Sequence, residues 1–484
     1  MGFAEKQREA GGLPAQVHEH EVGAGVVAVW NRFSPCVYTV SNEVLQVLRR
    51  GDAAGQLDEA SREALATAGV LDGSCAASKE DAFFFSLDAA LAHVDELADS
   101  FYAERQPYAN LYLVNLGCNL GCRYCVASHS RGGGERHKGK VAPHAKRLEA
   151  VLNVVDQYAA RRVEAHAEPV TVSFNGGEFL LHWDVLRRVV ERIKERHPGV
   201  KTEFFLNSNM TLMTPDRAAF LAENDFEVHV SFDGYRDLHD RTRVYRDGRG
   251  SYRDVLAGVK EFNSRKPTKP IVGFQGTIDV AEGFDAEALF RMSRHGFIEA
   301  RLAPNLLGVS EADAEAKADL MIELYEKGQR RKLKFTDTYF VNIRQLMKIE
   351  EFKFYFTCAG LAGFPTRGLA LNVDTLEMSQ LCSYVPEAAV PYDEIGGDIY
   401  NRRLWERARA YIRHRAQQLR TVCRQCDVVG VCRGSCLLMG LDAHNRINPA
   451  ACAYQRRLWR RVLEFAYRRA SKTARAQRKS TPEP

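Results

Sequence analysis

The stretch that decides the fold is Asn115-Leu-Gly-Cys-Asn-Leu-Gly-Cys-Arg-Tyr-Cys125, which directly follows the short apolar segment Leu111–Asn115. It carries three thiols, Cys118, Cys122 and Cys125, in the spacing C-x3-C-x2-C. Such a tripod can bind three irons of a 4Fe–4S cube, whereas a structural cluster normally takes four cysteines. Because no fourth cysteine follows closely, one iron keeps an open position where chemistry can occur. For the spacing alone, a zinc site or a structural cluster is the alternative.

Length and composition limit the class of protein. The chain has 484 residues, so more than one domain is expected. With 45% hydrophobic and 27% charged residues it has a globular composition, and its net charge of +5 is too small to indicate a nucleic-acid partner. The chain has neither an apolar run of membrane-spanning length nor an apolar signal core at its N-terminus. We therefore expect a soluble, cytoplasmic protein without nucleic-acid or membrane partners.

The twelve cysteines are unevenly distributed. Cys36 and Cys75 are isolated, three lie in the tripod, and seven lie between Cys358 and Cys452. Disulfide scaffolds are small and secreted, which this chain is not expected to be. In a reducing compartment, clustered cysteines indicate metal or cluster ligands instead.

From Tyr108 onward, strand and helix patterns alternate. Six strands are predicted, at Leu111–Asn115, Val170–Phe174, Thr202–Leu206, Glu227–Phe232, Ile271–Ile278 and Glu299–Pro304. Six β/α units in series predict an α/β fold with a parallel sheet curved into a partial (β/α)6 barrel. Functional residues in such sheets lie at the carboxyl ends of the strands, where the tripod is also found.

The chain divides into five predicted regions. Two strands within Gln16–Trp30, a third at Cys36–Ser41 and the helices that follow predict a winged-helix-like module. The C-terminal stretch is basic but also apolar, which favours a helix docked on the body with a solvated basic face over a nucleic-acid arm. The regions are residues 1–105 (module and linker helix), 106–310 (barrel), 311–357 (helical linker), 358–455 (cysteine-rich cluster domain) and 456–484 (C-terminal helix and basic tail).

The tripod follows the first strand of a β/α series, and Tyr124 precedes its third cysteine. In these features the chain resembles the radical S-adenosylmethionine (SAM) superfamily. The resemblance implies that Cys118, Cys122 and Cys125 hold a 4Fe–4S cluster whose open iron chelates SAM. One electron then cleaves SAM to methionine and a 5′-deoxyadenosyl radical, which abstracts a substrate hydrogen. The cofactor supplies this chemistry, while the protein positions it and excludes water.

Two further motifs follow in the order that the superfamily has. Asn175-Gly176-Gly177-Glu178-Phe179 resembles the Gly-Gly-Glu-Pro segment that holds the SAM amino group, with Phe179 in place of proline; a plain strand-to-helix turn is the alternative. Ser231-Phe-Asp-Gly234 and the segment from His239 to Arg243 resemble a signature of peptide-modifying members. The implied SAM contacts are Tyr124, Gly176, Gly177, Glu178, Ser231 and one of Arg241 or Arg243, with Asn207 and Asn209 as weaker candidates.

Asp233 belongs to the second of these motifs, at the predicted end of a strand facing the cavity. It is the candidate catalytic residue, as a base acting on the substrate or as a SAM ligand. The alternative is an ordinary turn or capping residue.

The C-terminal cysteines resemble the seven-cysteine SPASM extension, which binds two auxiliary 4Fe–4S clusters. The family pattern implies Cys423, Cys426, Cys432 and Cys452 for one cluster and Cys358, Cys382 and Cys436 for the other. The fourth site of the latter is open, or is completed by Cys36, Cys75 or another residue. Glu377 stands where the family usually has glycine, and zinc is the alternative for the C-x2-C and C-x3-C pairs. Three clusters in total are expected.

Within this family the chain resembles the thioether-forming maturases, in particular those of quinohemoprotein amine dehydrogenase small subunits, which join Cys sulfurs to Asp or Glu carbons. Sulfatase-maturating enzymes are a poorer match, because Ser383 rather than Asp follows Cys382. The resemblance implies a peptide or small protein substrate, taken as an added strand by the N-terminal module, and an electron donor such as flavodoxin or ferredoxin. The alternatives are peptide oxidation or carbon–carbon cross-linking, a module that is only a structural cap, and a non-enzymatic cluster or zinc scaffold.

Overall fold

The computed structural model describes residues 13–33, 37–50, 56–71, 73–125, 141–278, 284–337, 368–381, 385–432 and 446–480, except positions 15 and 68. Side chains at 73–87, 90, 386 and 473–480 are not described. The predicted ligands Cys358, Cys382 and Cys436 therefore lie outside the described residues, as do Cys36, Ser383 and the side chain of Cys75.

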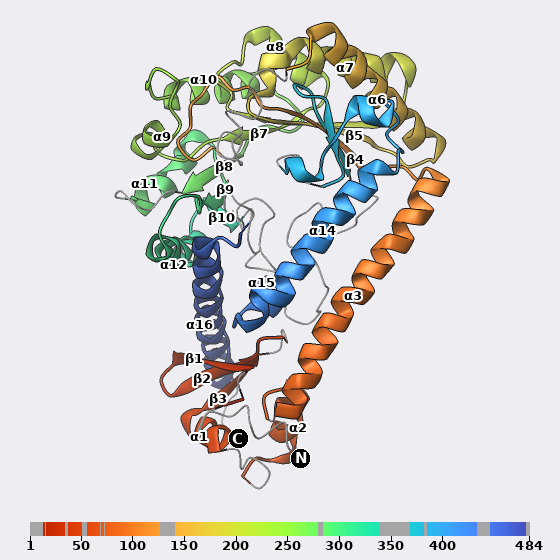
Figure 1. The fold of residues 1–484 in the computed structure, drawn as a ribbon. Helices are drawn as coiled ribbons and strands as arrows, with labels where there is room; N and C mark the ends of the chain where they lie inside the picture. Colours follow the sequence, from red (N-terminus) through yellow and green to blue (C-terminus); the bar gives the residue numbers. More distant parts are fainter. Residues whose placement is uncertain are drawn as a thin grey trace.

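A sheet of ten described strands forms the body of the molecule, at the top of Figure 1. Its order is β10-β9-β8-β7-β6-β5-β4-β11-β12-β13, and the first eight strands run parallel. All six predicted strands are confirmed, and the α/β fold with them. The strands are β4 (Asn110–Asn115), β5 (Val170–Gly176), β6 (Thr202–Ser208), β7 (Glu227–Ser231), β8 (Gly273–Ile278), β9 (Glu299–Pro304), β10 (Lys334–Asp337), β11 (Gly368–Asn372), β12 (Glu377–Ser379) and β13 (Val390–Pro391).

The sheet extends beyond the predicted barrel at both edges. After helix α12 (Glu311–Gly328), the predicted helical linker contains β10, which pairs in parallel with β9. In the predicted cluster domain, β11 pairs in parallel with β4, and β12 and β13 continue the sheet antiparallel. Segments of two to five residues are too short for a reliable alternation of apolar side chains, so the sequence pattern did not reveal them.

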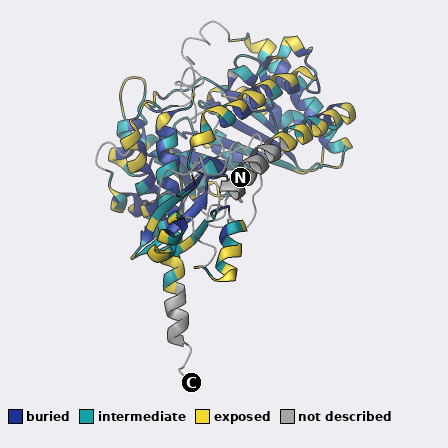
Figure 2. Cartoon of the chain, turned by 60° about the horizontal axis from the view of Figure 1, so that its bottom comes forward, coloured by how far each residue is buried: buried dark blue, intermediate teal, exposed yellow. Residues whose placement is uncertain are grey.

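Amphipathic helices connect the parallel strands and cover the sheet. In α7, the buried residues recur at helical spacing, from Val185 through Val189 to Ile193. Figure 2 shows the result, with buried residues on the sheet and on the inner helix faces and exposed residues outside. The helices are α6 (His144–Glu164), α7 (Trp183–Arg196), α8 (Pro215–Glu223), α9 (Arg236–Thr242), α10 (Tyr252–Ser264) and α11 (Ala286–Phe290), with 3-10 turns at Phe179–His182 and Arg291–His295.

The N-terminal module is a separate antiparallel sheet of β1 (Val17–Gly23), β2 (Val26–Asn31) and β3 (Val37–Ser41). Helices α1 (Asn42–Arg50) and α2 (Glu59–Thr67) pack on it around a small core. That core includes Val17, Val27, Val29, Leu45, Leu48, Leu65 and Val70. The long helix α3 (Gly73–Glu104) then leads from this module to the barrel (Figure 1).

Three C-terminal helices complete the described fold, namely α14 (Arg403–Thr421), α15 (Val429–Cys432) and α16 (Pro449–Ser480). The C-terminal helix begins at Pro449, earlier than predicted, so Cys452 lies on it. It docks as predicted, packing along α12 and against β1. Its arginines are only partly solvated, because Arg457 and Arg461 both pair with Asp319 of α12, at 2.8 and 3.1 Å. None of the described helices is both long and apolar enough to cross a lipid bilayer.

Candidate active site

The loop that carries Cys118, Cys122 and Cys125 begins where β4 ends, at the carboxyl edge of the sheet. Its backbone is fixed by the segment between α9 and α10. Gly121 N donates to Val244 O at 2.7 Å and Arg123 N to Thr242 O at 3.1 Å. The Arg246 guanidinium donates to Cys118 O at 3.1 Å. The three thiols are partly buried, and burial raises the pKa of Cys122 to about 12.

Two glycines, Gly176 at the end of β5 and Gly177 after it, allow the Cys-bearing loop to approach closely. A Cβ at Gly176 would lie 2.1 Å from Asn115 O, and one at Gly177 would lie 2.2 Å from Gly117 O. Both distances are impossible for a side chain, so only glycine fits here. The approach allows Gly177 N to donate to Asn115 O at 2.9 Å and Glu178 N to Gly117 O at 2.8 Å. The Gly-Gly-Glu segment therefore clamps the entry to the tripod.

Glu178 is fully buried at the edge of this clamp. Its carboxylate accepts from Asn209 N at 2.7 Å, Leu180 N at 3.0 Å and the Ser208 hydroxyl at 3.0 Å. Burial raises the pKa of Glu178 to about 7, although the donors of Asn209 and Leu180 act in the opposite direction. A buried carboxyl of this kind favours an added positive charge beside it.

Asp233 lies where β7 ends, and its side chain has no solvent exposure. Its Oδ1 accepts from Thr277 N at 2.9 Å and pairs with Arg243 Nε at 3.0 Å. Its Oδ2 accepts from Thr242 Oγ1 at 2.8 Å and from the hydroxyl of Tyr124. Burial alone would raise the pKa of Asp233, but the Arg243 guanidinium and His239 hold it below its ordinary value. Asp233 thus joins β7 to the tripod through Tyr124.

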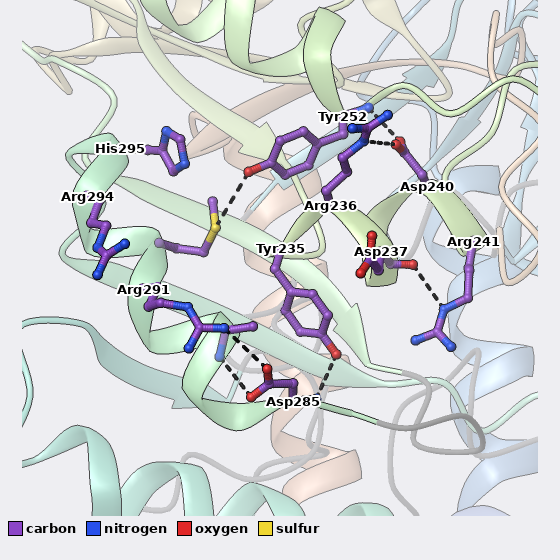
Figure 3. Close-up of a pocket in the computed structure, with 12 residues that line it drawn as sticks. Tyr235, Arg236, Asp237, Asp240, Arg241, Tyr252, Asp285, Arg291, Arg294 and His295 are labelled. Carbon is purple, nitrogen blue, oxygen red and sulfur yellow. Dashed lines mark hydrogen bonds and ion pairs between the residues drawn. The ribbon is translucent and has the colours of Figure 1, made fainter.

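The structure separates the two candidate arginines. The Arg243 guanidinium ion-pairs with Asp233 and lies 5.5 Å from the centre of the Tyr124 ring. Arg241 instead lines an open hollow of about 890 Å³ between α9, α10 and α11 (Figure 3). There its Nε donates to Asp237 O at 3.0 Å. Of the two candidates, Arg243 is therefore the one beside the tripod.

The remaining predicted contacts lie at the ends of β6 and β7. Asn209 Nδ2 donates to Asn119 Oδ1 at 3.0 Å and lies 3.8 Å from Cys118 Sγ. Asn207 donates to Asn175 through Nδ2, and its buried Oδ1 has no hydrogen-bond partner among the described residues. Ser231 is half-buried at the end of β7. The strand ends thus bring all of these residues to one edge of the sheet.

Four of the C-terminal cysteines lie together. One cavity of about 80 Å³ is lined by Cys423, Cys426, Cys432 and Cys452. Cys452 comes from α16, and the others come from the segment between the end of α14 and the end of α15. Neither these four cysteines nor the tripod, nor any other described His, Cys, Asp or Glu residues, form a group of three placed around a single metal ion. The Arg456 guanidinium faces this cavity and lies 3.3 Å from Asp427.

One residue of the site was missed by the sequence analysis. Asp374, just after β11, accepts from Leu116 N at 2.8 Å, immediately before the tripod. A single aspartate in a region with a weak pattern carries no signal of its own. The parallel pairing of β11 with β4, which places it there, was not predicted either.

Comparison with protein families identifies the domain that contains these residues. Residues 112–280 match the model of the radical SAM superfamily, from within β4 to just beyond β8. This segment is a radical SAM domain. The tripod, the Gly-Gly-Glu clamp and Asp233 all lie inside the matched range.

The sequence identity to individual relatives is low. The chain is 21% identical over 369 residues to "Radical SAM cyclopropyl synthase TigE" of Paramaledivibacter caminithermalis, covering 73% of each chain. It is 26% identical to the "Cysteine-type anaerobic sulfatase-maturating enzyme" of Clostridium novyi over 31% of this chain and 38% of that enzyme. With the sulfatase-maturating enzymes, the match thus spans well under half of their length.

About three quarters of the chain also has a solved structural counterpart. The structure named "Native anSMEcpe with bound AdoMet and Cp18Cys peptide" superposes with a TM-score of 0.53 and 19% identity, over 76% of this chain and 99% of that one. This likeness concerns the fold, and it extends beyond the radical SAM domain.

The residues present fit the groups that a radical SAM domain binds. The tripod offers the thiol donors of a 4Fe–4S cluster that lacks a fourth protein ligand. Beside it, the buried Oδ1 atoms of Asn115 and Asn207 have no hydrogen-bond partner among the described residues, which suits a polar ligand such as SAM. Cys118, Cys122 and Cys125 would hold the cluster. Glu178, Asn207 and Arg243 are the nearby groups suited to the charged and polar parts of SAM.

Proposed function

We propose that this protein is a radical SAM enzyme that modifies a peptide or small protein by joining a cysteine sulfur to a carbon of another residue. The observation that carries the proposal is the pair of cysteine sites. One is a three-thiol loop inside the radical SAM domain, and the other is a four-thiol cavity outside it. A second cluster site has no use in SAM cleavage alone, and it suits a second step on the substrate.

The bound cofactors would supply the radical chemistry. The side chains of this protein hold the reactive groups in place. Asp233 holds Arg243 and Tyr124 beside the tripod, and the Gly-Gly-Glu clamp holds the start of the Cys-bearing loop. Such preorganised positions are what a reaction that must exclude water requires.

Three further assignments belong to the proposal. Cys423, Cys426, Cys432 and Cys452 would hold one auxiliary 4Fe–4S cluster, and Cys358, Cys382 and Cys436 would belong to a second. Grouped thiols are suited to such clusters, and the four-thiol cavity supports the first assignment. An electron donor such as flavodoxin or ferredoxin would reduce the enzyme.

The substrate would be held by the N-terminal module. Its sheet order is β1-β2-β3, and β1 is covered by α16 while β3 pairs only with β2 among the described strands. An edge strand with unpaired backbone groups can take a peptide as an added strand. The relative named for a bound peptide is similar to this chain in fold, which supports a peptide substrate.

Mass spectrometry of the matured peptide tests the reaction. Forming a C–S bond breaks one S–H and one C–H bond, so each thioether lowers the mass by two hydrogens and protects one thiol from alkylation. Replacing Cys118, Cys122 and Cys125 by Ala should abolish both SAM cleavage and the mass change. An unmodified peptide after turnover by reduced wild-type enzyme would refute the proposal.

A second candidate function is carbon–carbon bond formation, favoured by the similarity to a cyclopropyl synthase over 73% of the chain. The same experiment separates the two. A carbon–carbon bond also removes hydrogens, but it leaves every substrate thiol free to react with an alkylating reagent.

Hydrogen–deuterium exchange tests the peptide site. Backbone amides of β3 (Val37–Ser41) should exchange more slowly when the substrate peptide is bound, because an added strand supplies their hydrogen-bond partners. Exchange in β8, inside the barrel sheet, serves as the internal control. Unchanged exchange in β3 would mean that the module does not bind peptide as a strand.

A further inference from the structure

The C-terminal region enters the barrel sheet beside the strand that leads to the tripod. β11 pairs in parallel with β4 from Gly368 opposite Asn110 to Asn372 opposite Val114. The pairing continues one residue further, where Val373 N donates to Val114 O at 2.7 Å. Parallel strands end at the same edge of a sheet, so the residue after Val373 lies next to the start of the Cys-bearing loop.

That residue, Asp374, is held in a fixed turn. Asn372 Oδ1 accepts from Asp374 N at 3.0 Å and from Thr375 N at 3.2 Å, the pattern of an Asx turn. The Asp374 side chain is only 8% exposed. The strand pairing and the turn therefore determine the position of Asp374, independently of its contacts with the Cys-bearing loop.

The Asp374 carboxylate joins the loop to the side chains of Arg147 and His182. Its Oδ2 accepts from Leu116 N at 2.8 Å and lies 3.4 Å from Gly117 N. Its Oδ1 lies 3.0 Å from Arg147 of α6 and 3.0 Å from His182 Nε2. Burial would raise the pKa of Asp374, but the donors of His182 and Leu116 lower it to about 2.

The Leu116–Gly117 backbone is thereby fixed from both sides. Asp374 takes its N–H groups, while the Gly117 carbonyl accepts from Asn115 Nδ2 and Glu178 N, each at 2.8 Å. Cys118 is the next residue in the chain. Hydrogen bonds behind a metal ligand orient it, and their loss typically costs about 10–100-fold in affinity or activity.

We propose that Asp374 is a positioning residue for the tripod: a carboxylate from the C-terminal region that orients Cys118, and with it the SAM-binding cluster. This rests on the proposed radical SAM function. The SAM site is then completed by a residue outside the range 112–280 that matches the superfamily.

The test compares Asp374→Ala and Asp374→Asn with Asp393→Asn, an exposed aspartate of the same region that pairs with Lys146 at 2.6 Å. All are purified anaerobically as full-length, cluster-loaded protein. SAM affinity is measured by equilibrium dialysis, and the electron paramagnetic resonance spectrum of the reduced protein is recorded with and without SAM.

We expect Asp374→Ala to weaken SAM binding about tenfold or more and to reduce the SAM-induced spectral change. Asp374→Asn keeps an acceptor for Leu116 N but loses the carboxylate charge that pairs with Arg147, so it should fall between Asp374→Ala and wild type. Asp393→Asn should match wild type. If Asp374→Ala does not fold, the Asn variant decides alone.

Wild-type SAM affinity and spectra in the Asp374 variants would overturn the inference, even with a lower unfolding temperature, because that result indicates a purely structural role. The proposed function fails separately, if wild-type protein itself shows no SAM-dependent spectral change or forms no thioether.

Discussion

At the scale of residues, the candidate site is built from buried carboxylates whose partners are already in place. Asp233 accepts from Thr277 and Thr242, contacts Tyr124 and pairs with Arg243. A carboxylate with both oxygens occupied and a lowered pKa is suited to holding neighbours in position. Glu178 differs from Asp233 in the direction of its pKa shift, because burial raises the pKa of Glu178.

Replacing Asp233 by Asn leaves Arg243 buried without its counter-charge, which typically costs about 3–5 kcal/mol. We expect a lower urea midpoint and the loss of both SAM cleavage and peptide modification. If Asp233 is instead the catalytic base, the variant should still cleave SAM and lose only the cross-link. Assaying 5′-deoxyadenosine and matured peptide in parallel decides between the two roles. Asp237→Asn, in the hollow of Figure 3, is the matched control.

Glu178 should make stability depend on pH. Burial raises its pKa to about 7 from 4.5, so between these values the folded state holds a proton that the unfolded state has released. The free energy of unfolding therefore falls as pH rises through this window. From pH 6 to pH 8, wild type should lose about 1 kcal/mol more than Glu178→Gln. Urea titrations at both pH values measure this, and identical pH dependence in the two proteins would contradict it.

At the scale of elements, the N-terminal sheet docks directly on the loop that carries three of the grouped cysteines. The Trp30 indole at the end of β2 donates to Asp427 O at 2.9 Å, and Gly430 N donates to Arg32 O at 2.9 Å. Phe33 packs beside Cys423 and Cys426. The module proposed to bind peptide and the proposed auxiliary site thus share an interface.

Replacing Gly430 by Ala should separate these two elements. A Cβ there would lie 2.7 Å from Arg32 O, too close for the backbone contact to persist. We expect faster proteolysis of the N-terminal module, with SAM cleavage unchanged. Thr421→Ala, at an exposed position at the end of α14, controls for substitution itself. Equal proteolysis of both variants would show that the contact does not hold the module.

At the scale of the whole molecule, three long helices run between the barrel and the N-terminal module, namely α3, α14 and α16 (Figure 1). α3 and α14 lie side by side and are joined by ion pairs, including Arg409 with Asp95 at 2.7 Å. Arg402 with Asp99 and Arg420 with Asp88 extend the row. The pairs range from partly to largely exposed, so each contributes about 0.2–1 kcal/mol and is screened by salt.

Replacing Asp88, Asp95 and Asp99 together by Asn should therefore change the unfolding midpoint little. The α3 backbone should nevertheless exchange hydrogen faster, and the difference from wild type should shrink in high salt. Hydrogen–deuterium exchange at two salt concentrations measures this. A variant whose α3 exchanges as slowly as wild type would show that apolar packing alone fixes the two helices.

The sequence by itself determined the six central strands, the docked C-terminal helix and the approximate position of the radical SAM domain. Periodic apolar residues and the tripod spacing are local signals, and local spacing fixes which residues share a strand end or a helix face. Only the tertiary structure decided that Arg243, and not Arg241, faces Asp233. Only it placed Asp374 beside Leu116. The Asp374–Leu116 contact joins residues 258 positions apart through a strand pairing of five residues, which leaves too little pattern to predict. The Arg243–Asp233 contact depends on how the chain turns back after α9, which residue spacing alone does not show.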